Sequence, residues 1–261
     1  MKILLYLFGA MATMHAAATS VTQSAYTRLR ELILTGEIPP GEKILLKVLS
    51  TQLQVNLSAL REALSRLSAE GLVVAEPQRG FRAAPFSLED LRHLSEARIE
   101  IETSCLRQAI DKGDLGWEGR VADAAHQLAR LSGKIRNETG GISCEWAFAH
   151  DRLHFALCSG CDNTWMLRIR EMLYTQSERY RSLAGPLAGG TRDIDAEHRE
   201  IVDASLARDA IAACALLAAH LRSTAEILMD AYKSGDRSET GEASPKGAAW
   251  SCPTEVVRPL G

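Results

Sequence analysis

Apolar residues recur with a helical period from Ala25 onward. Four of them fall at spacings of four, seven and eight, on one side of a helix: Ala25, Leu29, Leu32 and Ile33. Gly36 stands where such a helix ends, and the prolines and glycine of residues 37–41 predict a turn. The pattern therefore predicts that the first domain begins with an amphipathic helix.

A second and a third helix are predicted next, separated by residues 54–56. The apolar side of the second helix consists of Leu46, Leu49 and Leu53. Asn56 or Ser58 can accept hydrogen bonds from the unpaired amides at the start of the third helix. In this third helix the inward residues are Leu60, Ala63, Leu64 and Leu67, and the outward residues are Leu57, Ser58, Arg61, Glu62 and Ser65.

A β-hairpin is predicted after these helices, with strands at 72–75 and 81–84 around a turn at 77–80. A helix, a tight turn and a helix with a polar outer face form the arrangement that places the second helix in the DNA major groove. The hairpin would be the wing of this arrangement. Residues 20–85 are therefore expected to form a winged helix-turn-helix domain that binds double-stranded DNA.

Arg61 is the best donor to a base or a phosphate on the predicted recognition helix. Arg79 and Arg82 would lie on the wing, and Gly80 would let its tip approach a DNA backbone closely. Two alternatives remain open at this point. Instead of binding DNA, the domain could be a small helical module whose arginines are merely solvated, or it could be an adaptor that uses the winged helix for protein contacts.

The pattern changes at Pro85 and Ser87, where Ser87 and Asp90 have the spacing of a helix capping box. From there to Tyr232 nearly every segment has a helical period, and none has the alternation of a strand. The expected fold class is mainly α, with an all-helical bundle of six or seven helices in residues 86–232. Residues 1–19 are interpreted as a disordered or mis-assigned extension, and residues 233–261 as a disordered tail.

Composition limits the choice of function. With 261 residues, 46% of them hydrophobic, the chain can hold two modest cores. Residues 21–85 contain eight Lys and Arg and six Asp and Glu, whereas the whole chain has a net charge of −3. Such weak positive charge argues against indiscriminate coating of nucleic acid and favours a homodimer that reads a defined site.

The first residues resemble a secretory signal, but a DNA-binding domain directly behind them makes export senseless, so a cytoplasmic location is expected. No segment is expected to reach the length of a transmembrane helix, and no membrane partner is predicted. Cys158 and Cys161 form a lone C-x-x-C without a second pair, and we expect reduced thiols.

The candidate chemistry of the bundle lies in four histidines. His150 and His154 are four residues apart, so both project from one face of a helix. His198 and His220 are 22 residues apart, too far to meet on one helix, but a turn before Asp209 would let two antiparallel helices bring them level. Together the four imidazoles can converge on a divalent metal, Zn or alternatively Ni, Fe or Cu.

Other interpretations of these histidines remain open. A single histidine among apolar residues is more often a hydrogen-bonded core residue. Asp151 is three residues before His154 and is a reserve ligand in place of His150. The run from His150 to His154 also resembles the H-E-x-x-H of zinc peptidases, which gives a metal-dependent hydrolase as the alternative function. Asp151 is one methylene shorter than the usual Glu and no strand is available to align a peptide, so we expect no enzyme.

The runs PPGEKI, LSALREALSRLSAEGLV and PQRGF resemble the winged-helix domain of GntR-type bacterial transcription regulators. The resemblance covers about 65 residues. It implies DNA contacts at Lys47, Asn56, Ser58, Arg61 and Gly80, in addition to Arg79 on the wing. Leu57 stands where the family usually has an arginine that reads DNA, which suggests an altered operator or an apolar contact with a thymine methyl.

The helical region resembles the FCD ligand-binding domain of the FadR-like subgroup of that family. The resemblance rests on HDRLHFALCSGCDN, on AEHREIVDASLARDAIAA and on His220, and LYTQSERYRSL is closest to carbon-starvation-type repressors. It implies a metal bound by His150, His154, His198 and His220, where many members have an aspartate at the first position. It further implies a small carboxylate effector that relieves repression. From their helical segments Arg98 and Arg179 could pair with a second carboxylate, or each could instead form a surface or inter-helix salt bridge.

Overall fold

The computed structural model describes residues 21–135, 143–183 and 192–236. The chain divides into two compact units, and the division falls between Phe86 and Ser87. The expected extension before residue 20 and most of the expected tail lie outside the described residues. The last helix continues to Asp236, four residues beyond the end that the sequence indicated.

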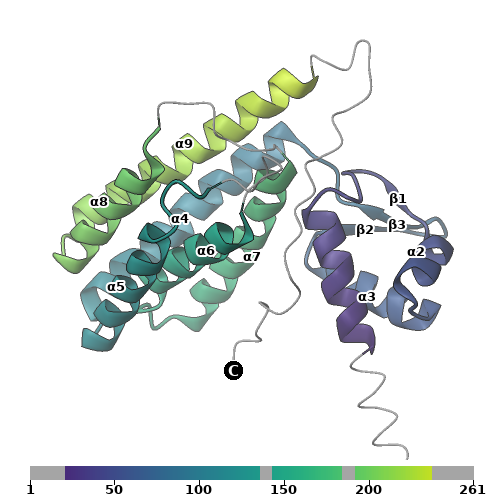
Figure 1. The fold of residues 1–261 in the computed structure, drawn as a ribbon, viewed down its shortest axis with the longest axis horizontal. Helices are drawn as coiled ribbons and strands as arrows, with labels where there is room; N and C mark the ends of the chain where they lie inside the picture. The colour runs from purple at the N-terminus through teal and green to yellow at the C-terminus, as the bar shows by residue number, and fades with distance from the viewer. Residues whose placement is uncertain (1–20, 136–142, 184–191, 237–261) are drawn as a thin grey trace, which may run out of the picture. The chain divides into compact units, whose positions relative to one another are not determined.

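The first unit is a winged helix. Its elements in chain order are a helix over residues 21–34, β1 (Lys43–Ile44), α2 (Leu46–Leu53), α3 (Leu57–Ala69), β2 (Val73–Glu76) and β3 (Gly80–Ala83). The strands form an antiparallel sheet in the order β1-β3-β2 (Figure 1). Strand β1 was not predicted, because two residues are too few to show an alternating pattern.

Leucines fill the core of this unit, and five of them are completely inaccessible: Leu29, Leu60, Leu64, Leu67 and Leu72. The oxygen of the Asn56 side chain accepts a hydrogen bond from the Ala59 amide at 2.9 Å and so caps α3. The inward side of α3 is buried as predicted, and all five predicted outward residues are exposed. The apolar period alone therefore determined which side of α3 is available to a partner.

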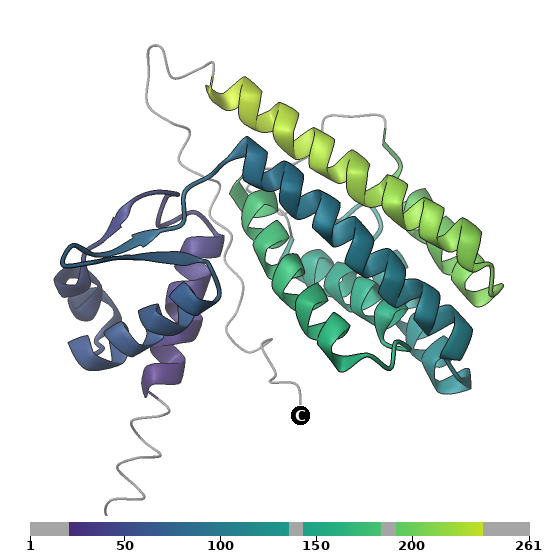
Figure 2. The ribbon, with the colours of Figure 1, turned by 180° about the vertical axis from the view of Figure 1, so that it is seen from behind.

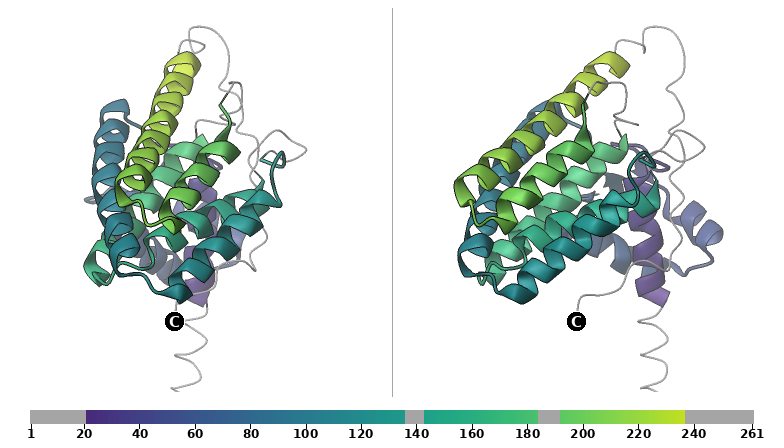
Figure 3. Two further views of the ribbon diagram at one scale, coloured as in Figure 1. Left: turned by 90° about the vertical axis from the view of Figure 1, so that its left-hand side faces the viewer. Right: turned by 60° about the vertical axis from the view of Figure 1, so that its left-hand side comes forward.

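The second unit consists of helices in its described part. They are α4 (Leu88–Lys112), α5 (Leu115–Ala129), α6 (Cys144–Cys158), α7 (Thr164–Leu183), α8 (Ile194–Leu206) and α9 (Ala210–Asp236). Helix α4 packs against α9 on one side and α7 on the other, as Figure 2 shows. Helices α5 and α6 pack together, and α8 runs beside α9, which can be followed in both views of Figure 3.

A tight turn reverses the chain between α8 and α9. Arg208 adopts a left-handed conformation with φ of 60°, and the Asp209 carboxylate accepts a hydrogen bond from the Ala212 amide at 2.9 Å. Asp209 is therefore the cap of α9, as predicted. The reversal brings residues equally far from the turn level with each other on the two helices.

Helix α9 is the one helix in the described residues with the length and composition of a membrane span, over Ala210–Lys233. The expectation that no segment reaches that length is therefore wrong. The helix packs against α4 and α8 inside the unit, and its apolar residues Ala213, Leu217 and Leu221 belong to the core. Because 44% of its apolar window is buried inside the unit, packing in the bundle accounts for part of its hydropathy.

Three cysteines form a small buried cluster beside this core: Cys105, Cys158 and Cys161. Burial raises the pKa of the Cys105 thiol to about 12, and it raises that of Cys158 as well. No disulfide joins the cysteines of the described residues. A buried thiol with a raised pKa is a poor nucleophile, so Cys158 is expected to contribute to packing rather than to chemistry.

Candidate metal centre and DNA-reading surface

The predicted DNA-reading residues lie on the solvent side of the first unit. Lys47 on α2, Arg61 on α3 and Arg79 on the wing are exposed, and none of the three is in an ion pair within the described residues. Arg82 differs, because it donates to the Gly41 carbonyl at 2.5 Å and pairs with Glu76 at 3.2 Å. Arg82 therefore fastens the wing to the preceding turn, while the other three cations stay available to phosphates.

The start of α3 combines polar and apolar groups. Ser58 is exposed, and Leu57 exposes 38% of its surface, an unusual amount for leucine. Asn56 uses its side-chain oxygen for the cap, which leaves its amide nitrogen as a donor. At the wing tip Gly80 has φ of +96° with no atom within 4 Å of a would-be Cβ, so the tip stands open to a partner.

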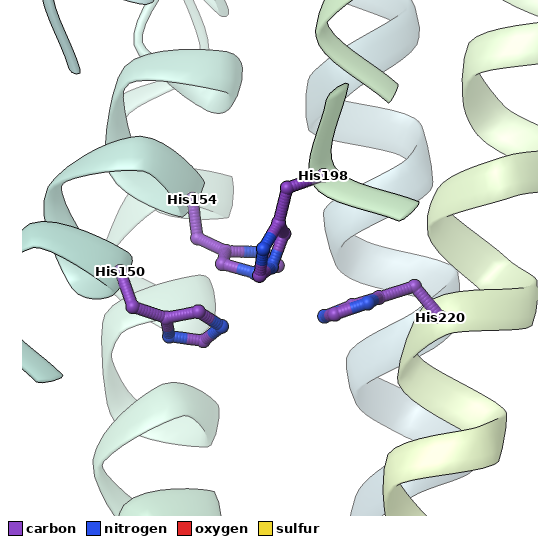
Figure 4. Close-up of side chains that lie close together, drawn as sticks. All are labelled: His150, His154, His198 and His220. Carbon is purple, nitrogen blue, oxygen red and sulfur yellow. The ribbon is translucent and has the colours of Figure 1, made fainter. Parts of the chain in front are cut away.

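The four predicted histidines meet inside the second unit (Figure 4). His150 and His154 come from α6, His198 from α8 and His220 from α9, and one nitrogen of each lies within 4.8 Å of the others. Every one of these side chains is at least 96% buried. Figure 4 shows ring nitrogens of His150 and His220 that point toward each other across the cluster.

Local sequence explains this convergence. The four-residue spacing puts His150 and His154 on the same side of α6, where their ring centroids are 4.5 Å apart. The reversal at Arg208 places His198 and His220 level on α8 and α9, with centroids 4.6 Å apart. Neither pair depends on a long connection, so each pair could be predicted from the sequence.

Burial keeps these imidazoles neutral. It lowers the pKa of His154 to about 3, and it lowers the pKa values of His150, His198 and His220 below their ordinary value. Neutral imidazole is the form that binds a metal ion. Both ring nitrogens of His154 and of His198 are buried without a hydrogen-bond partner. Orphaned nitrogens of this kind fit a bound ion, and four imidazoles suit zinc and its neighbours in the first transition row.

Two carboxylates that the sequence analysis missed lie behind the cluster. The Glu197 Oε2 atom is 2.8 Å from His220 Nδ1, and the Glu102 Oε2 atom is 3.6 Å from His154 Nδ1. Burial would raise the pKa of Glu102, but Arg98 beside it holds that pKa well below the usual range. Carboxylates behind metal-binding histidines orient the rings and increase their basicity. Both could have been found in the sequence, because Glu197 directly precedes His198 and Glu102 lies four residues after Arg98.

Arg98 and Arg179, which were predicted to bind a carboxylate of the effector, lie in different surroundings. Arg98 donates from Nε to Glu102 at 2.6 Å and from Nη1 to the Ser177 hydroxyl at 2.8 Å, while its Nη2 is buried without a hydrogen bond. Arg179 lies near the start of α4, with Nη2 3.8 Å from Asp90 and its guanidinium over the Tyr180 ring. The two arginines therefore contact different partners.

Another set of polar residues on α7 includes a direct neighbour of the histidines. Its members recur at spacings of four, three and four, and are Arg170, Tyr174, Ser177 and Arg181. All four are buried, and Arg181 Nη1 is 3.2 Å from His150 Nδ1. This helical spacing was visible in the sequence and was overlooked. The reserve ligand Asp151 lies 3.9 Å from Arg170 and is not part of the four-nitrogen cluster.

Comparison with known families gives two matches. Residues 21–82 match the family described as bacterial regulatory proteins of the gntR family, and residues 93–223 match the FCD domain. The first match covers the winged helix and the second contains all four histidines. Together they span both units.

Similar proteins are regulators of transcription. The chain is 35% identical to the helix-turn-helix regulator BphR of Paraburkholderia xenovorans, over 82% of this chain and 87% of the relative. It is 31% identical to the repressor GlaR of Escherichia coli, over 82% of this chain and 98% of the relative.

Two solved structures share the fold. McbR/YncC of E. coli superposes with a TM-score of 0.66 at 18% identity, over 81% of this chain and 98% of that one. A putative GntR regulator from Rhodococcus sp. RHA1 gives 0.64 at 23% identity, over 82% and 99%. At these sequence identities, the similarity shows a shared fold and nothing more specific.

Proposed function

Because this chain belongs to the GntR family of bacterial transcription regulators and carries an FCD domain, we propose that it is a cytoplasmic repressor controlled by a small carboxylate. In this proposal two copies of the chain read an inverted repeat in double-stranded DNA. The effector binds beside a divalent metal ion in the helical unit. The observation that carries the proposal is the buried cluster of four histidines with orphaned nitrogens.

On the DNA side, each exposed group has a specific task. Arg61 donates to a base edge or a phosphate, while Lys47 and Arg79 neutralise phosphates on either side of the recognition helix. Asn56 and Ser58 position the start of that helix, and Gly80 lets the wing approach the backbone. Leu57 contacts a thymine methyl where relatives use an arginine. Support comes from the exposure of all these residues and from the lack of ion pairs at the three cations within the described chain.

In the helical unit, His150, His154, His198 and His220 would hold the metal ion, and zinc is the first choice, with nickel the next. When bound, the ion supplies a concentrated positive charge that attracts a carboxylate. Glu102 and Glu197 orient His154 and His220 from behind. This role accounts for the carboxylate of Glu102 in the core, where an unpaired charge would be costly.

Buried arginines around the histidines would complete the effector site. Arg98 has a free Nη2 for a second carboxylate, and Arg170 and Arg181 add positive charge from α7. Arg179 remains a candidate only if its contact with Asp90 opens, since Asp90 already lies near its guanidinium. The effector would favour a dimer in which the spacing of the two recognition helices no longer matches successive turns of the operator. Repression would then be relieved.

Selection of bound fragments from a random duplex-DNA pool by the full-length protein tests this function. We expect a short inverted repeat to be enriched at moderate salt, and enrichment to be lost in Arg61→Ala. Arg28→Ala is the matched control, because Arg28 is exposed but paired with Glu31 at 2.6 Å. No enrichment with the wild-type protein, with zinc or with a chelator, would refute sequence-specific DNA binding.

A further inference from the structure

Two of the four histidines have an arginine at Nδ1, and their surroundings differ in one respect. At His220, Arg192 Nη2 lies 3.2 Å from Nδ1, and the Glu197 carboxylate lies 2.8 Å from the same nitrogen. Glu197 also accepts two hydrogen bonds from Arg192, each of 2.6 Å. His220, Arg192 and Glu197 therefore form a closed triad, in which one carboxylate accepts from both the ring and the guanidinium.

His150 and Arg181 form the same pair without the carboxylate. Arg181 Nη1 is 3.2 Å from His150 Nδ1, and both residues are at least 95% buried. In the described residues no carboxylate oxygen is hydrogen-bonded to His150, and Glu178 pairs with Arg181 alone, at 2.8 Å. The pair is thus an incomplete copy of the triad at His220.

The missing acceptor matters because a guanidinium can only donate. When Arg181 donates to His150 Nδ1, the proton of this neutral ring must sit on the other nitrogen, Nε2. That nitrogen points into the cluster (Figure 4), and once protonated it has no lone pair for a metal ion. For His150 to become a ligand, the proton must move to Nδ1, where it would face the donors of Arg181.

We propose that a carboxylate group of the effector inserts between His150 Nδ1 and Arg181 and completes the second triad. One carboxylate oxygen accepts from the ring and from the guanidinium, as Glu197 does at His220. The insertion frees His150 Nε2 for the metal ion. The proposal rests on the metal and effector site described above, and it assigns the effector's carboxylate to a defined position beside Arg181.

A coupling between the two ligands follows directly. A carboxylate raises the affinity for the metal ion by making a fourth imidazole available, and by linkage the metal ion raises the affinity for the carboxylate by the same factor. A charge-assisted hydrogen bond of this kind changes an equilibrium about tenfold or more. Without the carboxylate, the ion is held by His154, His198 and His220.

The experiment measures Zn²⁺ affinity of the metal-free full-length protein by calorimetry in acetate and in acetamide, a neutral molecule of the same shape. After correction for zinc bound to acetate in solution, we expect about tenfold tighter binding in acetate. Arg181→Met should bind zinc with equal affinity in both solutions. Arg168→Gln is the matched control, since Arg168 is an exposed arginine on the same helix and should retain the acetate effect. Equal affinities in the wild-type protein would overturn the proposal.

A second measurement uses the wild-type protein, so it does not depend on whether a variant folds. Long-range ¹H–¹⁵N NMR of the metal-free wild-type protein reports which nitrogen of each histidine carries the proton. We expect protonated Nε2 at His150 and protonated Nδ1 at His220, and protonated Nδ1 at both would overturn the proposal. These outcomes are separate from the proposed function, because zinc binding and operator selection can both succeed while the acetate effect is absent. Failure of zinc to bind at all would instead refute the metal centre itself.

Discussion

The two units differ in whether their candidate functional groups lie on the surface or in the core. The winged helix has Lys47, Arg61 and Arg79 on the outside of a core made of leucines, whereas the bundle has histidines, arginines and a glutamate inside its core. Surface cations are well solvated and add little to folding. Buried polar atoms without partners each cost about 1–3 kcal/mol. We therefore expect the winged helix to keep its fold when these cations are replaced, and we expect a bound ion to contribute part of the stability of the bundle.

The largest expected effect of this difference is stabilisation of the bundle by metal. At a zinc concentration about a thousand times the dissociation constant, the free energy of unfolding of the bundle should rise by about 4 kcal/mol. Thermal denaturation followed by calorimetry, with zinc and with a chelator, measures it. His198→Ala should show no zinc-dependent rise, and the exposed His126→Ala should match the wild-type protein. An equal response of both variants would mean that zinc binds elsewhere.

The next effect is a loss of bundle stability in mild acid. Burial depresses the pKa values of His150, His154 and His198 in the folded protein, so between about pH 6.5 and those values only the unfolded chain takes up protons. Stability is therefore complete above about pH 7 and falls as the pH drops through 6.5.

Between pH 7 and 5.5 each of these three groups should cost the metal-free protein roughly 1 kcal/mol, or about 3 kcal/mol in total. Chemical denaturation at several pH values measures this loss. The winged helix has no histidine in residues 21–86 and serves as the internal control. A pH-independent bundle would show that the histidines titrate normally and are not buried in solution.

A smaller effect is expected when the recognition helix is changed. Arg61→Ala should weaken operator binding by about 1–3 kcal/mol. Its free energy of unfolding should stay within about 0.5 kcal/mol of the wild-type value, because Arg61 is exposed and outside any ion pair of the described residues. Fluorescence anisotropy with the selected operator, together with denaturation, gives both numbers. A large loss of stability would place Arg61 in the core of the fold rather than on its DNA face.

The smallest change in affinity is expected at Leu57, where the main effect concerns sequence preference. Replacing the thymines of the operator with uracil removes their methyl groups, and we expect the wild-type protein to lose affinity by a few-fold. Leu57→Arg should be indifferent to this replacement and should favour guanine instead. Equal binding of both DNAs by the wild-type protein would contradict a methyl contact.

The sequence predicted those parts of the site that depend on local spacing. The pairs His150 with His154 and His198 with His220 followed from one helical period and one tight turn. Glu102 and Arg181 could not be assigned in this way, because they reach the cluster from α4 and α7, and the rotation of those helices depends on packing across the whole bundle.

The wing gives a second example of this limit. Its hairpin was predicted from two short segments around the turn at residues 77–80, but the sequence did not show that Arg82 turns inward to the Gly41 carbonyl while Arg79 stays outside. The contact partner of Arg82 lies 41 residues earlier, in the turn before β1. Hydrogen bonds between such distant segments leave no periodic signal in the chain.

X-ray absorption at the zinc edge of the purified, zinc-loaded full-length protein tests the central claim most directly. We predict one ion per chain, with a first shell of three or four imidazole nitrogens at about 2.0 Å. His198→Ala should lose the ion, while His126→Ala should keep it. A shell of sulfur or of oxygen atoms alone, or less than one-tenth of an ion per chain, would contradict a metal centre at the four histidines.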